Sequence, residues 1–353
     1  MNRAFKRLRH ALAAAGWAAA LGVQAQTADH FHILPAVNGT YENRDDGVPS
    51  RREVPVIVDL FFSRDLDRLR VLAELQVDNH TAELERGQIG YRFTPKTSLW
   101  VGRFHNPLGF WNTEHHHGHY FETSIGRPRI VEFEDEGGVL PIHLAGFLLE
   151  TGVGVGDGAL QLDAALGSGP KYDGDNLAPV DLLRGAALNK RAATLRLAWQ
   201  PDLTRETHYG VFAARTDIPV TGPLPAVVTQ TVRGAYANLD TRSFNLLCEI
   251  FHLAHTQSSG PPLAWPSYWA GHVQAEYKLV PGVWTPYARV EMMSHRVTGD
   301  YAQRFPLLTK NRQIAGVRWD FRSNQALKLQ LMRETTFDRQ LTTGIAAQWS
   351  ALF

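Results

Sequence analysis

The sequence predicts an all-β protein in which about 16 antiparallel strands form a single transmembrane barrel. The main observation is a recurring run of about ten residues in which apolar and polar side chains alternate, as in 69–77, 194–200, 271–279 and 326–332. This alternation is typical of barrel strands that turn one face to lipid and the other to a water-filled lumen. In addition, no segment after residue 25 has 18 consecutive apolar residues, which excludes helical membrane spans.

Sixteen such runs can be placed between turn residues along the chain. They are expected at 31–41, 55–62, 68–77, 83–93, 98–104, 143–155, 159–166, 190–199, 207–215, 231–238, 242–255, 268–279, 283–295, 311–321, 325–334 and 342–353. The connections after odd-numbered runs are long, at 43–54, 105–142, 167–189, 217–230, 256–267 and 296–310. Those after even-numbered runs are short, for example 94–96 and 322–324. Long loops on one edge and tight turns on the other are typical of membrane barrels.

The first 25 residues have the features of an export signal. The segment begins with four basic residues, Arg3, Lys6, Arg7 and Arg9. An apolar run covers 11–23, and a small-residue cleavage pattern ends at Ala25. A single transmembrane helix is the alternative, but spanning a bilayer requires about 20 apolar residues. We therefore expect 1–25 to be a cleaved signal peptide and 26–353 to be the barrel.

The charge balance argues against a nucleic-acid partner. The chain has 36 Lys and Arg and 35 Asp and Glu, and four of the basic residues belong to the expected signal peptide. The remainder therefore has 32 basic and 35 acidic residues, without the basic excess that nucleic acid requires. Cys248 is the only cysteine, so no internal disulfide can form.

A soluble periplasmic β-sandwich would also have alternating strands, with the apolar face buried between two sheets. Aromatic residues near the ends of the runs favour the membrane barrel, because Trp and Tyr gather at membrane interfaces. These residues are Trp199, Tyr209, Tyr277, Trp319 and Trp349.

Two features of the chain resemble the porins of bacterial outer membranes. The chain ends in an alternating segment with a terminal Phe353, like the closing strand of outer-membrane barrels. The segment 101–109, with Gly102, Phe104 and Pro107, is similar to the Gly-[basic/polar]-Phe-x-x-Pro-[apolar]-Gly pattern of phosphate-selective porins. The loop that follows is acidic and histidine-rich and lacks a lysine cluster, so phosphate is not the expected solute.

The resemblance implies an outer-membrane porin, reached by export through the periplasm, that lets small hydrophilic or charged solutes diffuse passively. It also implies a homotrimer embedded in outer-membrane lipid, and a third external loop that folds into the lumen and narrows it. By its order in the chain this loop is 105–142. We expect no cofactor and no enzyme activity. Ser124 lies near His119 and Glu122 in sequence, but not at the fixed spacing of a nucleophile and its base.

The segment from His105 to His143 contains six of the 15 histidines, together with many acidic residues. Aromatic residues such as Phe110 and Trp111 indicate that this long loop is ordered. Its charged and histidine residues are the candidates for a pore constriction. They are Glu114, His115, His117, His119, Glu122, Arg127, Arg129, Glu132, Glu134, Asp135 and Glu136.

The lumen face of the alternating runs carries the candidates for a charged pore wall. They are Arg70, Glu74, Arg86, Arg92, Arg196, Arg289, Glu291 and Arg318. An acidic loop opposite arginines would create a transverse field that orients dipolar solutes and disfavours apolar ones. The alternative is that the wall charges pair across strands, each pair contributing roughly 0.2–1 kcal/mol.

The histidine tract allows a second hypothesis, an outer-membrane protein that binds and takes up a metal or another ligand. Imidazole and carboxylate together suit a transition metal such as zinc, copper or nickel. His115 and His117 lie on one side of an extended segment, and a bend at the next glycine would let His119 join them. The favoured interpretation of the tract is a solvated or hydrogen-bonded loop, and a gate that titrates near pH ~6.5 is a further alternative. Arg127 and Arg129 could hold anionic solutes or anchor the loop through neighbouring carboxylates.

Overall fold

The computed structural model describes residues 29–47, 49–115, 118–174, 176–182, 189–220, 226–258, 262–280, 282–297, 301, 304–305 and 308–353. The expected signal peptide, 1–25, lies outside the described residues, as do His116 and His117. In the described ranges no helix is long and apolar enough to cross a membrane.

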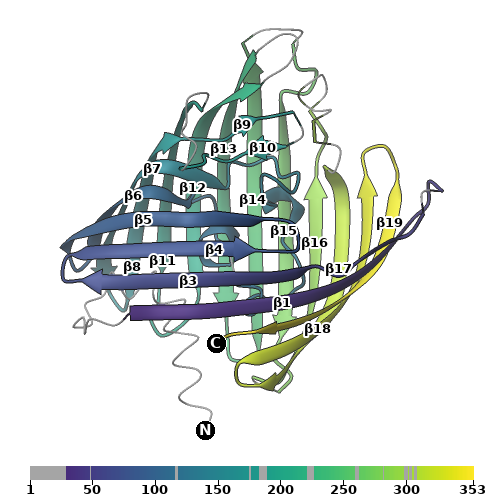
Figure 1. Ribbon diagram of the computed structural model, residues 1–353, viewed down its shortest axis with the longest axis horizontal. Helices are drawn as coiled ribbons and strands as arrows, with labels where there is room; N and C mark the ends of the chain where they lie inside the picture. Colours follow the sequence, from purple (N-terminus) through teal and green to yellow (C-terminus); the bar gives the residue numbers. More distant parts are fainter. Residues whose placement is uncertain are drawn as a thin grey trace.

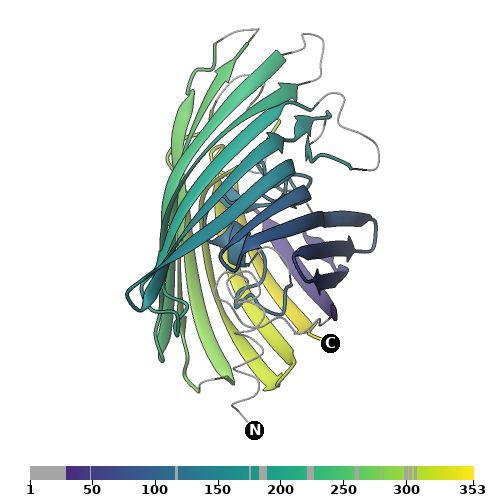
Figure 2. The same ribbon diagram turned by 90° about the vertical axis from the view of Figure 1, so that its left-hand side faces the viewer.

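Sixteen long strands form a closed antiparallel barrel with tilted strands (Figures 1 and 2). They are β1 (Asp29–Arg44), β3 (Val56–Leu66), β4 (Leu69–Val77), β5 (Ala82–Thr94), β6 (Thr97–His105), β7 (His143–Val155), β8 (Gly158–Ser168), β11 (Arg191–Gln200), β12 (His208–Val220), β13 (Ala226–Asp240), β14 (Phe244–Gln257), β15 (Ser267–Tyr277), β16 (Trp284–Met293), β17 (Thr309–Arg322), β18 (Gln325–Thr336) and β19 (Leu341–Ala351). Pairing of β1 with β19, from Ala36 opposite Ser350 to Arg44 opposite Thr342, closes the barrel.

Three short strands lie in the long connections. β2 (Arg51–Glu53) pairs with β1, and β9 (Lys171–Tyr172) pairs with β10 (Leu177–Ala178). The beginning of β1 and the residues after β19 lie side by side, because Ile33 and Phe353 exchange backbone hydrogen bonds of 2.9 Å. Both ends therefore lie on the edge with the short turns, as an even strand number requires.

Each of the sixteen runs predicted from the sequence overlaps one long strand of the barrel. The predicted connection 217–230 is wrong over most of its length, because β12 continues to Val220 and β13 already begins at Ala226. Ile218 and Val228 pair there, and both side chains are buried in the core beneath the strands. Because these side chains pack against the core, the pairing of β12 with β13 continues through residues whose turn propensity favoured a loop.

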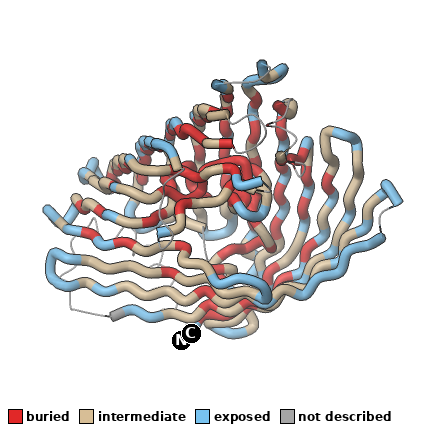
Figure 3. The backbone as a smooth tube through the Cα atoms, turned by 45° about the horizontal axis from the view of Figure 1, so that its top comes forward, coloured by how far each residue is buried: buried red, intermediate tan, exposed pale blue. Residues whose placement is uncertain are grey.

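The two faces of each strand have different surroundings, and β11 shows this clearly. Leu195 and Leu197 point outward and are 53% and 41% exposed, whereas Thr194 and Arg196 point inward and are 4% and 3% exposed. This matches the expected alternation of an apolar outer face and a polar inner face. In Figure 3 the buried residues are concentrated in the middle of the barrel, on the loop inside it and on the strand segments next to that loop.

The largest hydrophobic core lies inside the barrel rather than between two sheets. It joins Leu108, Phe110 and Trp111 of the connection after β6 to inward residues of β12–β15, such as Phe212 and Phe251. The connection contains a short helix, α2 (Trp111–Glu114), and a 3-10 turn, η1 (Arg129–Val131). Part of the lumen is therefore filled by packed side chains.

Candidate functional site

Loop 105–142, called L3 below, begins and ends at paired positions of the barrel wall. His105 at the end of β6 is opposite His143 at the start of β7. The side-chain amide of Asn106 donates to the carbonyl of Pro141 (2.7 Å), and Asn106 is fully buried. This bond continues the pairing of the two chain segments just beyond the last rung of the sheet.

Helix α2 is held by a carboxylate from the far wall of the barrel. Glu249 of β14 accepts hydrogen bonds from the backbone N–H groups of Phe110 (2.6 Å) and Trp111 (3.2 Å). The same carboxylate contacts Nε2 of His272 on β15 at 2.9 Å, and both side chains are fully buried. A carboxylate suits this position because the first N–H groups of a helix have no partner within the helix.

The contact between Glu249 and α2 depends on Gly109. Gly109 has a φ of +81°, and a Cβ on it would lie 2.3 Å from Oε1 of Glu249. A side chain here would therefore strain the backbone and displace the carboxylate. The glycine that ends the porin-like sequence pattern thus makes room for the group that docks L3.

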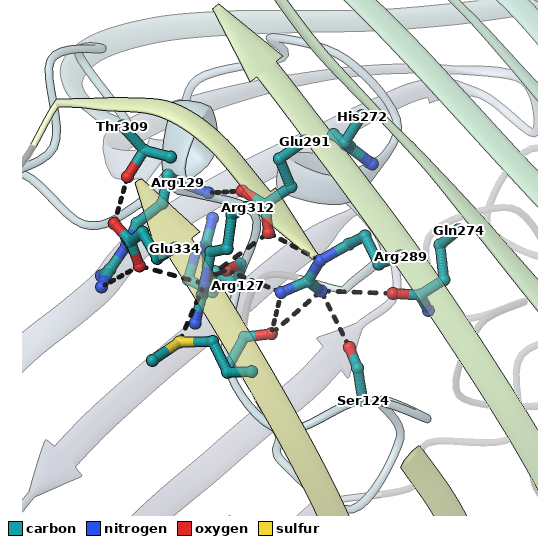
Figure 4. Close-up of polar contacts among 12 residues, drawn as sticks. Ser124, Arg127, Arg129, His272, Gln274, Arg289, Glu291, Thr309, Arg312 and Glu334 are labelled. Carbon is teal, nitrogen blue, oxygen red and sulfur yellow. Dashed lines mark hydrogen bonds and ion pairs between the residues drawn. The ribbon is translucent and has the colours of Figure 1, made fainter. Parts of the chain in front are cut away.

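Four basic side chains of β16, β17 and β18 bind the middle of L3. They are Arg289, Arg312, Arg318 and Lys328. Arg318 donates to the carbonyls of Tyr120 (2.5 Å) and Glu122 (2.8 Å), and Arg289 donates to the carbonyl of Arg127 (3.0 Å; Figure 4). These charge-assisted bonds satisfy buried backbone groups that lie outside any helix or sheet. The expectation that Arg289 and Arg318 line the open pore is therefore corrected, because L3 covers them.

Carboxylates complete this contact between L3 and the wall. Glu291 accepts from Nε of Arg289 (2.9 Å) and from the backbone N–H of Arg129 (2.6 Å; Figure 4). The guanidinium of Arg129 lies between Glu132 (3.1 Å) and Glu334 (3.2 Å). The contacts favour the interpretation of Arg129 as an anchor of the loop over that of an anion-binding residue.

The end of L3 is fixed by a buried histidine between two carboxylates. Nδ1 of His143 is 2.8 Å from Glu134 of L3, and Nε2 is 2.9 Å from Glu85 of β5. The ring stacks on Phe133 at 6.2 Å, and the guanidinium of Arg127 covers the same phenyl ring at 4.1 Å. Glu134 and Arg127 therefore also hold the loop and do not face open solvent.

A cavity of about 290 Å³ remains between L3 and the wall formed by β1, β3–β8 and β11. Of the predicted constriction residues, Glu114 and His115 line this cavity. Of the predicted wall residues, those that line it are Arg70, Glu74, Arg86 and Arg196. Arg92 instead pairs with Asp65 (2.8 Å) near the turn edge and does not line the cavity.

The wall arginines of the cavity pair with carboxylates, as the alternative interpretation expected. Arg86 contacts Glu74 at 2.6 Å, and Arg196 contacts Asp163 at 2.6 Å. Arg196 also donates to the hydroxyl of Thr113 in α2 (2.8 Å). The last bond ties the wall of the cavity to L3.

The other constriction candidates that the structure describes lie away from the cavity. Asp135 and Glu136 are exposed at the end of L3, and the carbonyl of Asp135 accepts from the side chain of Asn176 (2.7 Å). Glu122 is 3% exposed, and its carboxylate is 3.8 Å from Nδ1 of His119. Burial raises the pKa of Glu122 to about 7, although Lys328 and Arg127 oppose the shift.

His119 does not have the properties of the proposed pH gate. Burial, reinforced by the positive charges of Lys328 and Arg127, lowers the pKa of His119 to about 4. The ring is therefore uncharged from pH ~5 to ~8, the range over which a gate would titrate. His115 lies against the rings of Phe110 (5.5 Å) and Trp111 (5.2 Å), which favours a packed position.

No group of three or more histidine, cysteine or acidic residues among the described part of the chain has the arrangement of a metal site. His117 lies outside the described residues. The proposal of a metal on His115, His117 and His119 therefore stays a prediction.

Several residues that shape the site were not predicted from the sequence. Glu85 faces inward because β5 has a bulge, with Arg86 opposite Glu74 and Leu84 opposite Leu75. A bulge breaks the alternation locally, so the parity of the run assigns Glu85 to the wrong face. Glu249 was missed for another reason, since its neighbours on both faces of β14 are largely apolar. A lone carboxylate within such a run is the signal that could have identified it.

The fold is similar to solved outer-membrane proteins, although no protein-family model and no characterised protein matches the sequence. OmpT of Vibrio cholerae, in its trimer form, superposes with a TM-score of 0.57 at 11% identity, covering 92% of this chain and 99% of that one. OprB of Pseudomonas putida has a TM-score of 0.57 at 9% identity, covering 92% and 94%. The outer-membrane channel DcaP of Acinetobacter baumannii has a TM-score of 0.52 at 13% identity, covering 94% and 99%. The chain has the fold of the porin-type outer-membrane barrels, a closed barrel of 16 antiparallel strands.

Proposed function

We propose that the chain is an outer-membrane porin through which small hydrophilic or charged solutes diffuse passively. The observation that carries the proposal is the cavity beside L3, which is lined by charged side chains inside a barrel with an apolar outer face. Water and ions can occupy such a lumen, because 16 strands enclose more space than side chains alone fill. One of the similar structures is itself an outer-membrane channel, which supports the proposal.

L3 sets the width and charge of the passage in this proposal. Its docking on β14–β18 leaves Glu114 and His115 facing the wall residues Arg70, Arg86 and Arg196 across the cavity. Solutes therefore pass a constriction with both signs of charge, where rate and selectivity depend on pore width and on these side chains. No bond is made or broken during passage.

The proposal includes export and assembly. Segment 1–25 would be removed during export, and the barrel would assemble in the outer membrane. The trimeric form of one similar barrel supports assembly of this chain into homotrimers. Fractionation of the membranes, the N-terminal sequence of the mature protein and the mass of the detergent-solubilised complex test these three points.

Single-channel recording in planar lipid bilayers tests the channel itself. We expect discrete, ohmic conductance steps from the purified protein, with permeation of both small cations and small anions. A protein that inserts as a folded barrel but produces no steps would overturn the proposal. Protein denatured before addition serves as the control for leakage caused by detergent.

A further inference from the structure

The cavity has an unusual wall for the lumen of a membrane barrel. Inward positions of barrel strands ordinarily carry polar residues. Here six apolar side chains from five strands line the cavity, namely Leu34, Phe61, Leu72, Trp100, Phe104 and Leu148. The indole of Trp100 lies on Gly90, where a Cβ would be 2.5 Å from the ring, so its position is fixed. The sequence predicts a lumen that disfavours apolar groups, whereas this wall offers them apolar side chains to contact.

The charges of the same cavity are unequal. Three arginines line it, and each has a carboxylate partner; that of Arg70 is Asp65 at 2.9 Å. Five carboxylates line it, namely Glu74, Glu114, Glu150, Asp163 and Glu206. Carboxylates therefore outnumber arginines along the lining, and two of the carboxylates, Glu74 and Asp163, pair with arginines. Glu150 lies beside the apolar wall, because it accepts a hydrogen bond from Nε1 of Trp100 (2.7 Å).

The aromatic rings of the cavity already hold cationic groups. The guanidinium of Arg70 lies over Trp100 at 4.8 Å from the ring centroid, and that of Arg86 lies over Phe61 at 5.5 Å. These distances are within the range in which a cation is attracted to the face of a ring. These ring faces are already occupied, and the wall presents apolar side chains and carboxylates within one space.

We propose that this cavity is a binding site for small amphipathic cations, in which an ammonium group is carried on an aromatic or branched aliphatic body. The body would lie on the apolar wall near Trp100 and Leu148, and the ammonium group would face Glu150 and Glu114. The inference rests on the proposed channel function, since the solute reaches the cavity along the pore. The volume of about 290 Å³ exceeds the ~150 Å³ of an apolar cavity that binds benzene, which suits a body with one ring.

Other solute classes use only part of this site. An aromatic carboxylate would gain the apolar contact but would face more carboxylates than arginines, and those arginines already have partners. A small polar ammonium ion would gain the charge contact but would leave the apolar wall in water. An amphipathic cation gains both contributions, so its binding should exceed that of either partial analogue.

Block of the single-channel current by three probes tests the inference. The probes are 2-phenylethylammonium, 3-phenylpropionate, which keeps the ring and reverses the charge, and ethanolammonium, which keeps the charge and removes the ring. We expect half-maximal block by 2-phenylethylammonium at a concentration about tenfold lower than for either analogue. Equal block by all three probes, or strongest block by 3-phenylpropionate, would overturn the inference while leaving the channel intact.

Two variants and a matched control locate the site. Glu150→Gln removes the carboxylate with little change of shape, and should weaken block by 2-phenylethylammonium about fivefold. Trp100→Leu should weaken block by 2-phenylethylammonium by a similar factor and leave ethanolammonium unchanged. Glu53→Gln changes a carboxylate on the exposed strand β2 and should have no effect on block. If Glu150→Gln conducts normally and binds 2-phenylethylammonium as tightly as the unaltered protein, the site is not where we place it. Complete absence of conductance in the unaltered protein would overturn the channel and this inference together.

Discussion

The two halves of the barrel use the same residue types for different purposes. In the half formed by β12–β18, L3 packs on an apolar core, and inward arginines donate to its backbone carbonyls. In the half formed by β1, β3–β8 and β11, inward arginines pair with carboxylates and line an open cavity. The first half positions the loop, and the second half presents the surface that a solute would meet in the proposed channel. An inward arginine is therefore not by itself a sign of a pore-lining residue.

The difference follows from what lies against the inner face of each strand. Inward residues of the first half lie beneath L3, so they can be apolar, as Phe212 and Phe251 are. Charged groups there must find partners, because an isolated buried charge is costly. Arg70 and Arg86 of the second half remain partly exposed, at 13% and 23% of their side-chain areas, and retain contact with the cavity. Changes in the first half should therefore affect docking of the loop, and changes in the second half should affect selectivity.

The largest effect is expected for Glu249→Ala in the filled half. The change removes the acceptor for two buried N–H groups of α2 and the partner of His272. Removal of one member of a buried charged contact costs about 3 kcal/mol or more. Docking of L3 should therefore weaken on the order of a hundredfold. Limited proteolysis of the folded barrel measures this as faster cleavage within 106–142, since cleavage follows local opening.

Glu53→Ala on exposed β2 is the matched control and should leave the cleavage rate unchanged. Both variants should retain the barrel, which heat-modifiable migration in electrophoresis can verify. Protection of L3 in the Glu249→Ala protein equal to that in the unaltered protein would contradict the assigned role of this carboxylate.

A smaller loss of docking is expected for Arg318→Met. Arg318 donates to two carbonyls of L3 and lies over the ring of Tyr120 at 5.0 Å. Hydrogen bonds to charged groups contribute about 1.5–3 kcal/mol, so cleavage within L3 should accelerate by roughly ten- to a hundredfold. Arg92→Met removes an arginine that pairs only with Asp65 among the contacts described, and serves as the control. Equal cleavage rates in the two variants would show that Arg318 does not anchor the loop.

Glu122 and His119 predict a pH dependence of docking in which two effects oppose each other. The pKa of Glu122 is raised to about 7, so ionisation penalises the docked loop increasingly as pH rises from ~4.5 towards ~7. The pKa of His119 is lowered to about 4, so protonation in the released loop penalises docking as pH falls below ~6.5. The two pH dependences nearly cancel between pH ~4.5 and ~6.5, so the sum of the two penalties stays roughly constant over that range.

Glu122→Gln separates the two effects. Because only the unaltered protein has the ionisation penalty of Glu122, protection of L3 in the variant relative to the unaltered protein should increase by up to about tenfold per pH unit from pH ~4.5 to ~7. The ratio of the two proteins removes contributions from other groups near L3. Hydrogen exchange of the L3 amides at several pH values, corrected for the intrinsic exchange rate, measures it. A constant ratio across this range would contradict a raised pKa of Glu122.

The sequence predicted the barrel well because the strand signal is local. Alternation, turn residues and the even number of runs do not depend on knowing which segments meet in space. The runs that became β4 and β11 alternate along their length, and Arg70, Glu74 and Arg196 of these strands line the cavity, although Leu72 shares the inner face of β4. β14 is apolar on its inner face as well, at Leu247, Phe251 and Leu253, because L3 covers that side. Alternation is lost where the lumen is filled, and a sequence alone does not show where that occurs.

The site was harder to predict because the partners of each charge are distant in sequence. Glu114 and His115 could be proposed from the histidine-rich composition, but nothing near them indicates that Glu249 docks their helix. Arg289 and Glu291 contact L3 and do not line the cavity, a distinction that depends on the path of L3. The alternation of side chains along a strand identifies the face on which a residue lies, whereas the path of a long loop determines what that face contacts.

The smallest effect is expected in the open half, for Arg70→Gln. Arg70 lines the cavity, and its partner Asp65 would retain a second arginine, Arg92, at 2.8 Å. The fold should therefore be unaffected, while the loss of one positive charge should raise the cation-to-anion permeability ratio about twofold at low salt. Reversal potentials in a salt gradient measure this ratio. Arg92→Gln removes the other partner of Asp65. Arg92 does not line the cavity, so this variant should change the ratio less. Equal changes of the permeability ratio in the two variants would mean that charge along the whole turn edge of the barrel, rather than charge on the wall beside L3, determines the ratio.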